Sequence, residues 1–152
     1  MIFRSEMSIF KEKTESLIMA LGIDYNNSHI AYDILELGAG DGSKTQHLLK
    51  RMLDLRINFN YHAGDISQNS LNMLQKKLES KLPALTVVKH QGQYIDIIEK
   101  FYERREKQYK NDNKNRILNR KTIVLFLGSS IGNMLENVSA KPSFIILLEN
   151  IF

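Results

Sequence analysis

The feature that most constrains the fold is a run of residues, Ile123 to Leu127, that is apolar at every position. A strand with one face in water alternates apolar and polar residues, so an unbroken apolar strand is buried on both faces. Sheets covered by helices on both faces are of the mostly parallel, doubly wound kind. The run therefore predicts an α/β protein with a Rossmann-like sheet.

The rest of the chain alternates between helix and strand signals, as this fold requires. Leucines at positions 71, 74 and 78 repeat at helical spacing, and Pro83 stops that helix. We predict helices at about 5–21, from 43, at 68–81 and around 98–102, and strands at 34–37, 59–63, 85–88 and 123–127. These elements form one domain over residues 1–152. Because open doubly wound sheets normally contain more strands, we expect this sheet to be incomplete.

The formal charge of +4 is concentrated in one polar segment. Residues 103–121 hold eight Lys or Arg against three Asp or Glu, whereas the remaining chain holds 13 against 14. A single polar, Asn-rich segment is typical of a solvated helix end and loop, so we predict a charged loop at about 103–121. No aromatic platform accompanies the charge, so we do not expect a nucleic-acid partner.

The composition also bears on compartment and on metal sites. The chain has no cysteine, which excludes disulfides and thiolate metal sites and suits a reducing cytoplasm. Met1 to Phe10 lacks the pattern of a secretory signal, and no apolar run approaches the length of a membrane span. His62 and His90 stand alone without ligand-type spacing, so we expect ordinary polar residues at strand ends and no metal site. A soluble cytoplasmic protein without a membrane partner is expected.

The first candidate for chemistry is the glycine-rich segment Glu36 to Gly42, ELGAGDG, which lies after a predicted strand and before a predicted helix. Glycines allow a tight turn and a close backbone approach to a ligand, and the following helix offers its positive N-terminal end. The spacing G-x-G-x-G departs from the dinucleotide pattern G-x-G-x-x-G. The segment favours a cofactor-binding turn, and a glycine-rich turn without a ligand is the alternative.

Asp65 is the second candidate, because it ends the second predicted strand 23 residues after Gly42. A carboxylate there can accept both ribose hydroxyls of a nucleoside lying across the strand ends. Asp65 could instead cap the following helix together with Ser67. We favour ribose binding.

The third candidate is the segment Gly128 to Asn133, GSSIGN, which follows the apolar strand. Its G-x-S-x-G pattern is that of a hydrolase nucleophile elbow with Ser130 as the nucleophile. That triad needs a histidine after the serine, and all four histidines of the chain precede it. The alternative places the segment at the ligand-binding edge of the sheet, where Asn133 would direct an amide at a substrate.

Together these segments resemble the histidine-specific N-methyltransferase family that makes the betaine precursor of ergothioneine. The resemblance rests on ELGAGDGSKTQHLL, DISQNSL, GQY at 92–94 and FLGSSIGN at 126–133, in matching order and spacing. It implies S-adenosylmethionine as the cofactor. By resemblance, the cofactor contacts are Gly38, Ala39, Gly40, Lys44, Asp65, Gln93 and Tyr94. The substrate contacts implied in the same way are Gly128, Ser129 and Asn133.

The resemblance implies N-methylation of the α-amino group of histidine or a similar small amino acid. Gln93 departs from the acid that the family places against adenine, although its carbonyl oxygen can still accept a hydrogen bond. The chain covers under half of the family's usual length, and the substrate domain is expected to be absent. A catalytically silent cofactor-binding module is therefore the alternative to an active enzyme. The sequence assigns no catalytic base and no oligomeric state.

Overall fold

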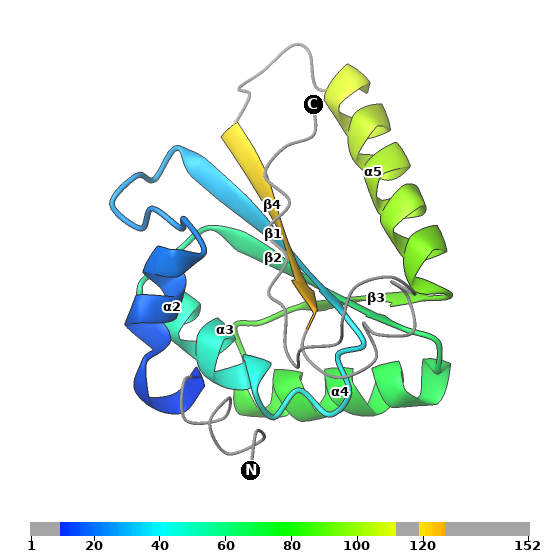
Figure 1. Cartoon of the computed structure of the whole chain (residues 1–152), viewed down its shortest axis with the longest axis horizontal. Helices are drawn as coiled ribbons and strands as arrows, with labels where there is room; N and C mark the ends of the chain where they lie inside the picture. Colours follow the sequence, from blue (N-terminus) through cyan, green and yellow to red (C-terminus); the bar gives the residue numbers. More distant parts are fainter. Residues whose placement is uncertain (1–9, 112–118, 127–152) are drawn as a thin grey trace, which may run out of the picture.

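The computed structural model of the protein describes residues 10–111 and 119–126, which form a four-stranded sheet flanked by helices (Figure 1). The predicted alternation of helices and strands is confirmed in this part of the chain. The elements in chain order are α2 (Thr14–Ala20), β1 (Ile30–Leu37), α3 (Thr45–Asp54), β2 (Phe59–Asp65), α4 (Gln68–Lys81), β3 (Val87–Gln91), α5 (Tyr94–Asn111) and β4 (Asn119–Phe126).

The sheet has the strand order β3-β2-β1-β4, and every neighbouring pair is parallel. β1 is central, with Ile34 opposite Tyr61 of β2 on one side and Ile123 of β4 on the other. All but the first residue of β1 are buried, as a strand covered on both faces requires. Because the strands are parallel, their C-terminal ends meet at one edge of the sheet.

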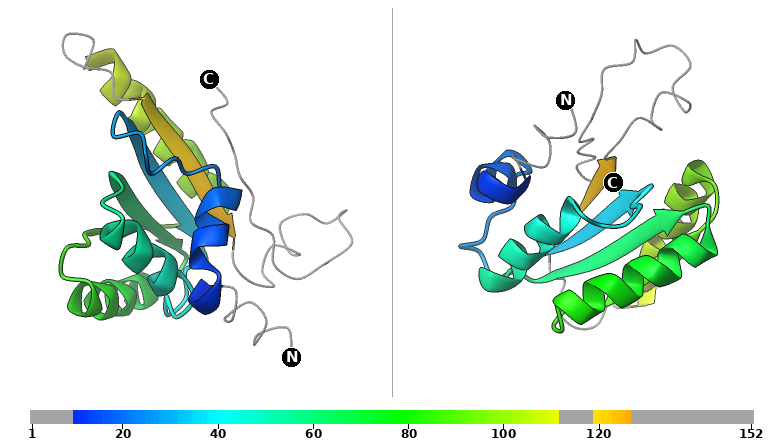
Figure 2. Two further views of the ribbon diagram at one scale, coloured as in Figure 1. Left: turned by 90° about the vertical axis from the view of Figure 1, so that its left-hand side faces the viewer. Right: turned by 90° about the horizontal axis from the view of Figure 1, so that it is seen from below.

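Two apolar clusters cover the two faces of the sheet. The larger cluster joins the sheet to α2, α3 and α4 through residues such as Ile18, Leu48 and Leu74. The smaller cluster joins it to α5 and includes Leu35 and Phe101. Figure 2 shows α3 and α4 along one side of the strands and α5 along the other. The doubly wound arrangement predicted from the sequence is thus present.

The N-terminal helix predicted over 5–21 is interrupted at Lys13, whose φ of −121° and ψ of 33° are not helical. The hydroxyl of Thr14 donates to the carbonyl oxygen of Phe10 at 2.6 Å, and such side-chain bonds compete with the helical backbone pattern. α2 therefore begins at Thr14, and Gly22 follows its end with a φ of 71°. Residues 5–9 lie outside the described part of the chain.

The charged loop predicted at about 103–121 is wrong at both of its ends. α5 continues to Asn111 and β4 begins at Asn119, so only residues 112–118 lie between them, outside the described residues. Lys, Arg and Glu are good helix formers, which explains the longer helix. Arg105 of α5 also donates to the hydroxyl of Thr122 and to the carbonyl oxygen of Arg120, fixing the helix to β4.

The third strand begins two residues later and ends three residues later than predicted, at Val87–Gln91 in place of 85–88. The backbone N–H of Leu85 donates to the carbonyl oxygen of Leu82 at 2.9 Å, so the residues around Pro83 form a turn. The apolar character of Leu85 reflects burial of this turn against the core and not strand pairing.

His62 and His90 do not stand alone, contrary to the sequence prediction. Nδ1 of His62 lies 2.9 Å from Nε2 of His90, and the ring of Phe101 meets both imidazoles edge-on. Their positions on adjacent strands bring them together on the α5 face.

Among the described residues, no group of three or more His, Cys, Asp or Glu is placed to hold a metal ion. None of the helices described is long and apolar enough to cross a membrane.

Candidate functional site

The glycine-rich segment forms the connection between β1 and α3, and its backbone depends on glycine. Gly38, Gly40 and Gly42 all have positive φ, at 67°, 57° and 70°. L side chains rarely adopt this conformation, whereas glycine does so without steric cost. The N–H of Gly38 donates to the carbonyl oxygen of Gly64 at 2.8 Å, which joins the loop to the end of β2.

The two sides of this loop have different surroundings. A Cβ added at Gly42 would lie 2.6 Å from Cδ1 of Leu74 in α4, so this side is packed against the core. A Cβ added at Gly40 would meet nothing within 4 Å. Ala39 is buried, and Lys44 is half-buried at the start of α3. The loop therefore has its backbone open to a ligand around Gly40.

Asp65 is half-buried at the end of β2, at the same edge of the sheet as the glycine loop. Its Oδ1 accepts a hydrogen bond from the N–H of Ser67 at 2.9 Å. The side chain that caps α4 is that of Ser67, whose hydroxyl accepts from the N–H of Ser70. Ser67, and not Asp65, thus caps α4 with its side chain. The hydrogen bond from the N–H of Ser67 occupies one carboxylate oxygen of Asp65.

Gln93 and Tyr94 follow β3 at this same edge. The N–H of Gly92 donates to the carbonyl oxygen of Asp65 at 3.1 Å, which holds the start of α5 beside the end of β2. Gln93 is exposed. Its backbone carbonyl oxygen accepts a hydrogen bond from the backbone N–H of Ile97 in the first turn of α5. The ring of Tyr94 instead packs edge-on against Phe126 of β4, with centroids 5.2 Å apart.

The structure thus brings the seven predicted cofactor residues to one edge of the sheet, from three consecutive strand ends. Gly128, Ser129, Ser130 and Asn133 follow β4 and lie outside the described residues. The last described residue of β4, Phe126, is opposite Leu37 of β1, directly before the glycine loop.

Glu36 was named in the sequence only as the first residue of the glycine-rich segment and was given no role of its own; it is the penultimate residue of β1. Glu36 is 2% exposed, and each of its carboxylate oxygens accepts a hydrogen bond of 2.6 Å, one from Thr45 and one from Tyr61. Burial raises the pKa of Glu36 to about 7, against the opposing effect of these two bonds and of Lys44. The available signal was an acid two residues before the first glycine, in a strand whose neighbouring positions are apolar.

A family model described as histidine-specific methyltransferase, SAM-dependent, matches residues 2–143 of the chain. The chain belongs to this methyltransferase family. S-adenosylmethionine is therefore the cofactor of the family to which it belongs, as expected from the sequence. The predicted resemblance is confirmed at the level of the family. A comparison with curated proteins yields no match.

Among solved structures, the chain is similar to a crystal structure from Methanococcus maripaludis described as an S-adenosyl-L-methionine-dependent methyltransferase. The sequence identity is 14% and the TM-score is 0.43. The alignment covers 89% of this chain and 64% of that structure, so the chain spans less than two thirds of its length. A similarity at this level leaves the family assignment to the sequence match.

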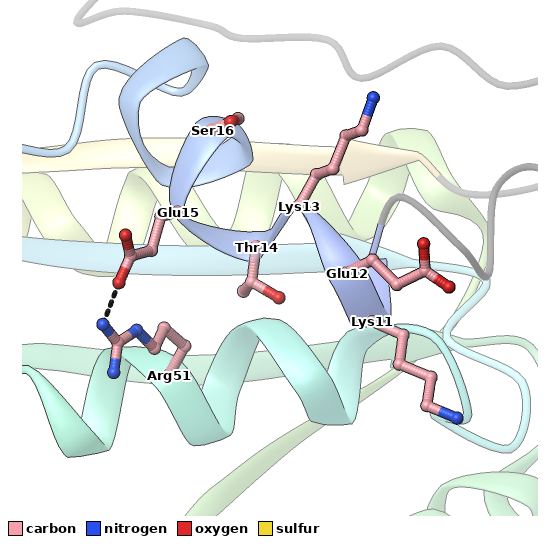
Figure 3. Close-up of a pocket in the computed structure, with 7 residues that line it drawn as sticks. All are labelled: Lys11, Glu12, Lys13, Thr14, Glu15, Ser16 and Arg51. Carbon is pink, nitrogen blue, oxygen red and sulfur yellow. Dashed lines mark hydrogen bonds and ion pairs between the residues drawn. The ribbon is translucent and has the colours of Figure 1, made fainter.

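A separate hollow of about 410 Å³ lies beside α2, lined by residues 11–16 together with Arg51 of α3 (Figure 3). Its lining consists of polar and charged side chains, and Arg51 forms an ion pair with Glu15 across it. The glycine loop enters α3 at its first turn, whereas Arg51 lies in the last turn. No aromatic side chain lines this hollow, and we assign no nucleoside site to it.

Proposed function

We propose that the protein transfers a methyl group from S-adenosylmethionine to the α-amino nitrogen of histidine or a similar amino acid. Membership of the histidine-specific methyltransferase family supports this proposal. The observation that carries it is the meeting of the left-handed glycine loop and Asp65 at one edge of a parallel sheet, where open α/β sheets bind ligands. The product of complete N-methylation of histidine would be the betaine that precedes ergothioneine.

The residues of the loop fit a nucleoside cofactor with a charged tail. The open space around Gly40 would admit the cofactor to the backbone, and a side chain there would occupy that space. Asp65 would hold the ribose hydroxyls through its carboxylate, and Lys44 would reach the carboxylate of the methionine part. Gln93 would accept from the adenine amino group. When bound, S-adenosylmethionine supplies an electrophilic methyl group on a good leaving group.

The protein's contribution to such a transfer is chiefly orientation. Holding the amine and the methyl group in line at near-attack distance replaces a bimolecular encounter with an oriented one. By family resemblance, Gly128, Ser129 and Asn133 would hold the amino acid beside the cofactor. The attacking amine must be unprotonated, and we assign no residue as its base. We place the reaction in the cytoplasm, because a chain without cysteine suits a reducing compartment.

The proposal is tested by titration calorimetry with S-adenosylmethionine, followed by mass spectrometry of histidine incubated with the chain and the cofactor. We expect saturable binding and methylated histidine. Binding without methylation of any aromatic amino acid would favour a silent cofactor-binding module. No binding to the folded chain would overturn both readings.

Asp65→Ala tests the ribose contact. Hydrogen bonds to charged groups contribute about 1.5–3 kcal/mol each, so its loss should weaken cofactor binding by roughly 10- to 100-fold. Asp54→Ala is the matched control, because Asp54 is an exposed acid that pairs with Lys50 and is the last residue of α3, away from the glycine loop. Equal affinity of the Asp65→Ala and Asp54→Ala variants would contradict the role of Asp65.

A further inference from the structure

Glu36 connects the elements that border the glycine loop. The carboxylate lies on β1, one of its donors is Thr45 in the first turn of α3, and the other is Tyr61 on β2. The loop occupies the residues between Glu36 and Thr45, so the 2.6 Å bond between these two side chains spans it. One buried carboxylate therefore fixes both ends of the loop against the neighbouring strand.

The arrangement matches the ionised form of the carboxylate. Both partners are hydroxyls that donate, and each oxygen of Glu36 accepts one of them. A protonated carboxyl would have to use one oxygen as a donor, so one of these hydroxyl bonds would turn around or be lost. The geometry of the loop is thus linked to the charge on Glu36.

Among the residues that the structure describes, few charged groups surround Glu36. Lys44 at the start of α3 is the cation that favours its ionised form, and the β4 neighbour in register, Leu125, has no ionisable group. From α4, Lys77 reaches the loop at Asp41 and Ser43. Burial nevertheless holds the pKa of Glu36 at about 7. A further positive charge near the loop would therefore change its protonation at neutral pH.

We propose that Glu36 is a positioning residue of the cofactor loop, and that binding of the cationic cofactor releases its proton to solvent. This inference rests on the proposed function. S-adenosylmethionine carries a sulfonium charge, and its product S-adenosylhomocysteine does not. By linkage, the ligand that favours the carboxylate binds more tightly as pH rises through neutrality. The carboxylate then discriminates the charged cofactor from the spent product.

The test is titration calorimetry of the full chain with each ligand between about pH 6 and about pH 8. We expect the affinity for S-adenosylmethionine to rise about fivefold to tenfold, and that for S-adenosylhomocysteine to rise less. Glu36→Gln should abolish the part of the rise that Glu36 causes. Titration of the ligand's own groups affects the wild type and the variant equally, so it cancels when the two proteins are compared with the same ligand. Asp33→Asn is the matched control, because Asp33 is a buried acid of the same strand that contacts Arg120 and not the loop.

A pH-independent affinity in the wild type, or an equal rise in the wild type and in Glu36→Gln, would overturn this inference and leave the proposed function standing. Absence of binding at every pH would overturn both. Should Glu36→Gln fail to fold, Tyr61→Phe removes one donor from the carboxylate and should move the rise in affinity to higher pH. Proton release on binding, measured in buffers of different ionisation enthalpy, gives a readout on the wild type alone. Release of no proton at neutral pH would contradict the proposal.

Discussion

At the scale of single residues, Gly40 and Gly42 distinguish two reasons for glycine in the loop between β1 and α3, which are backbone conformation and packing space. Both have a positive φ, but a Cβ at Gly42 would lie 2.6 Å from Leu74, whereas a Cβ at Gly40 would lie in open space. Backbone conformation is therefore common to the two positions, and packing against α4 belongs to Gly42 alone.

Gly42→Ala is expected to lower the free energy of unfolding by about 2–5 kcal/mol. A left-handed alanine costs roughly 1–2 kcal/mol, and overpacking against Leu74 adds about 1–3 kcal/mol. Gly40→Ala should cost only the first of these, so it is the matched control. Urea denaturation of both variants measures the difference. Equal losses of unfolding free energy would show that Leu74 of α4 moves aside without an energetic penalty.

The placement of Gly38 and Asp65 at one edge of the sheet could be predicted from the sequence, whereas the surroundings of Glu36 could not. Gly38 and Asp65 each follow a strand, and parallel strands necessarily bring their ends to one edge. The environment of Glu36 depends instead on Tyr61, 25 residues away, and on the register that places the two side chains together. Pairing of this kind is a tertiary property that no local pattern contains.

At the scale of elements, α5 is the helix that alone covers one face of the described sheet. Its contact centres on Phe101, which is 5% exposed and packs against His62, His90 and Tyr102. The sequence predicted this helix but ended it too early, because its exposed half is as charged as a loop. Helix propensity and the contact of Arg105 with β4 decide the outcome.

Phe101→Ala is expected to lower the free energy of unfolding by about 3–5 kcal/mol, because it removes a buried ring from the smaller cluster. Lys100→Ala, at the exposed neighbouring position, should change it by less than about 0.5 kcal/mol. Chemical denaturation followed by far-UV circular dichroism measures both. A small effect of Phe101→Ala would mean that α5 contributes little to the stability of the sheet.

At the scale of the whole molecule, the buried Glu36 and the half-buried His90, on opposite faces of the sheet, give the free energy of unfolding opposite dependences on pH. The folded pKa of Glu36 is about 7 against an ordinary 4.5, so between these values the folded chain holds a proton that the unfolded chain has released. Stability from Glu36 is present below pH 4.5 and is lost as pH rises to about 7.

Burial, aided by His62, lowers the pKa of His90 to about 4 against an ordinary 6.5. There the unfolded chain holds the extra proton, so stability is present above pH 6.5 and is lost as pH falls towards 4.

Because the two windows overlap, the free energy of unfolding of the wild type should change little between about pH 4.5 and pH 6.5. Glu36→Gln removes the falling contribution, so its stability should rise with pH over this range. His90→Gln removes the rising contribution, so its stability should fall by up to about 3 kcal/mol as pH approaches 7. Urea denaturation at several pH values measures the three slopes. A substitution that lowers stability equally at every pH leaves the slope of the free energy of unfolding against pH unchanged. Parallel slopes in the wild type and both variants would therefore show that neither Glu36 nor His90 sets the pH dependence.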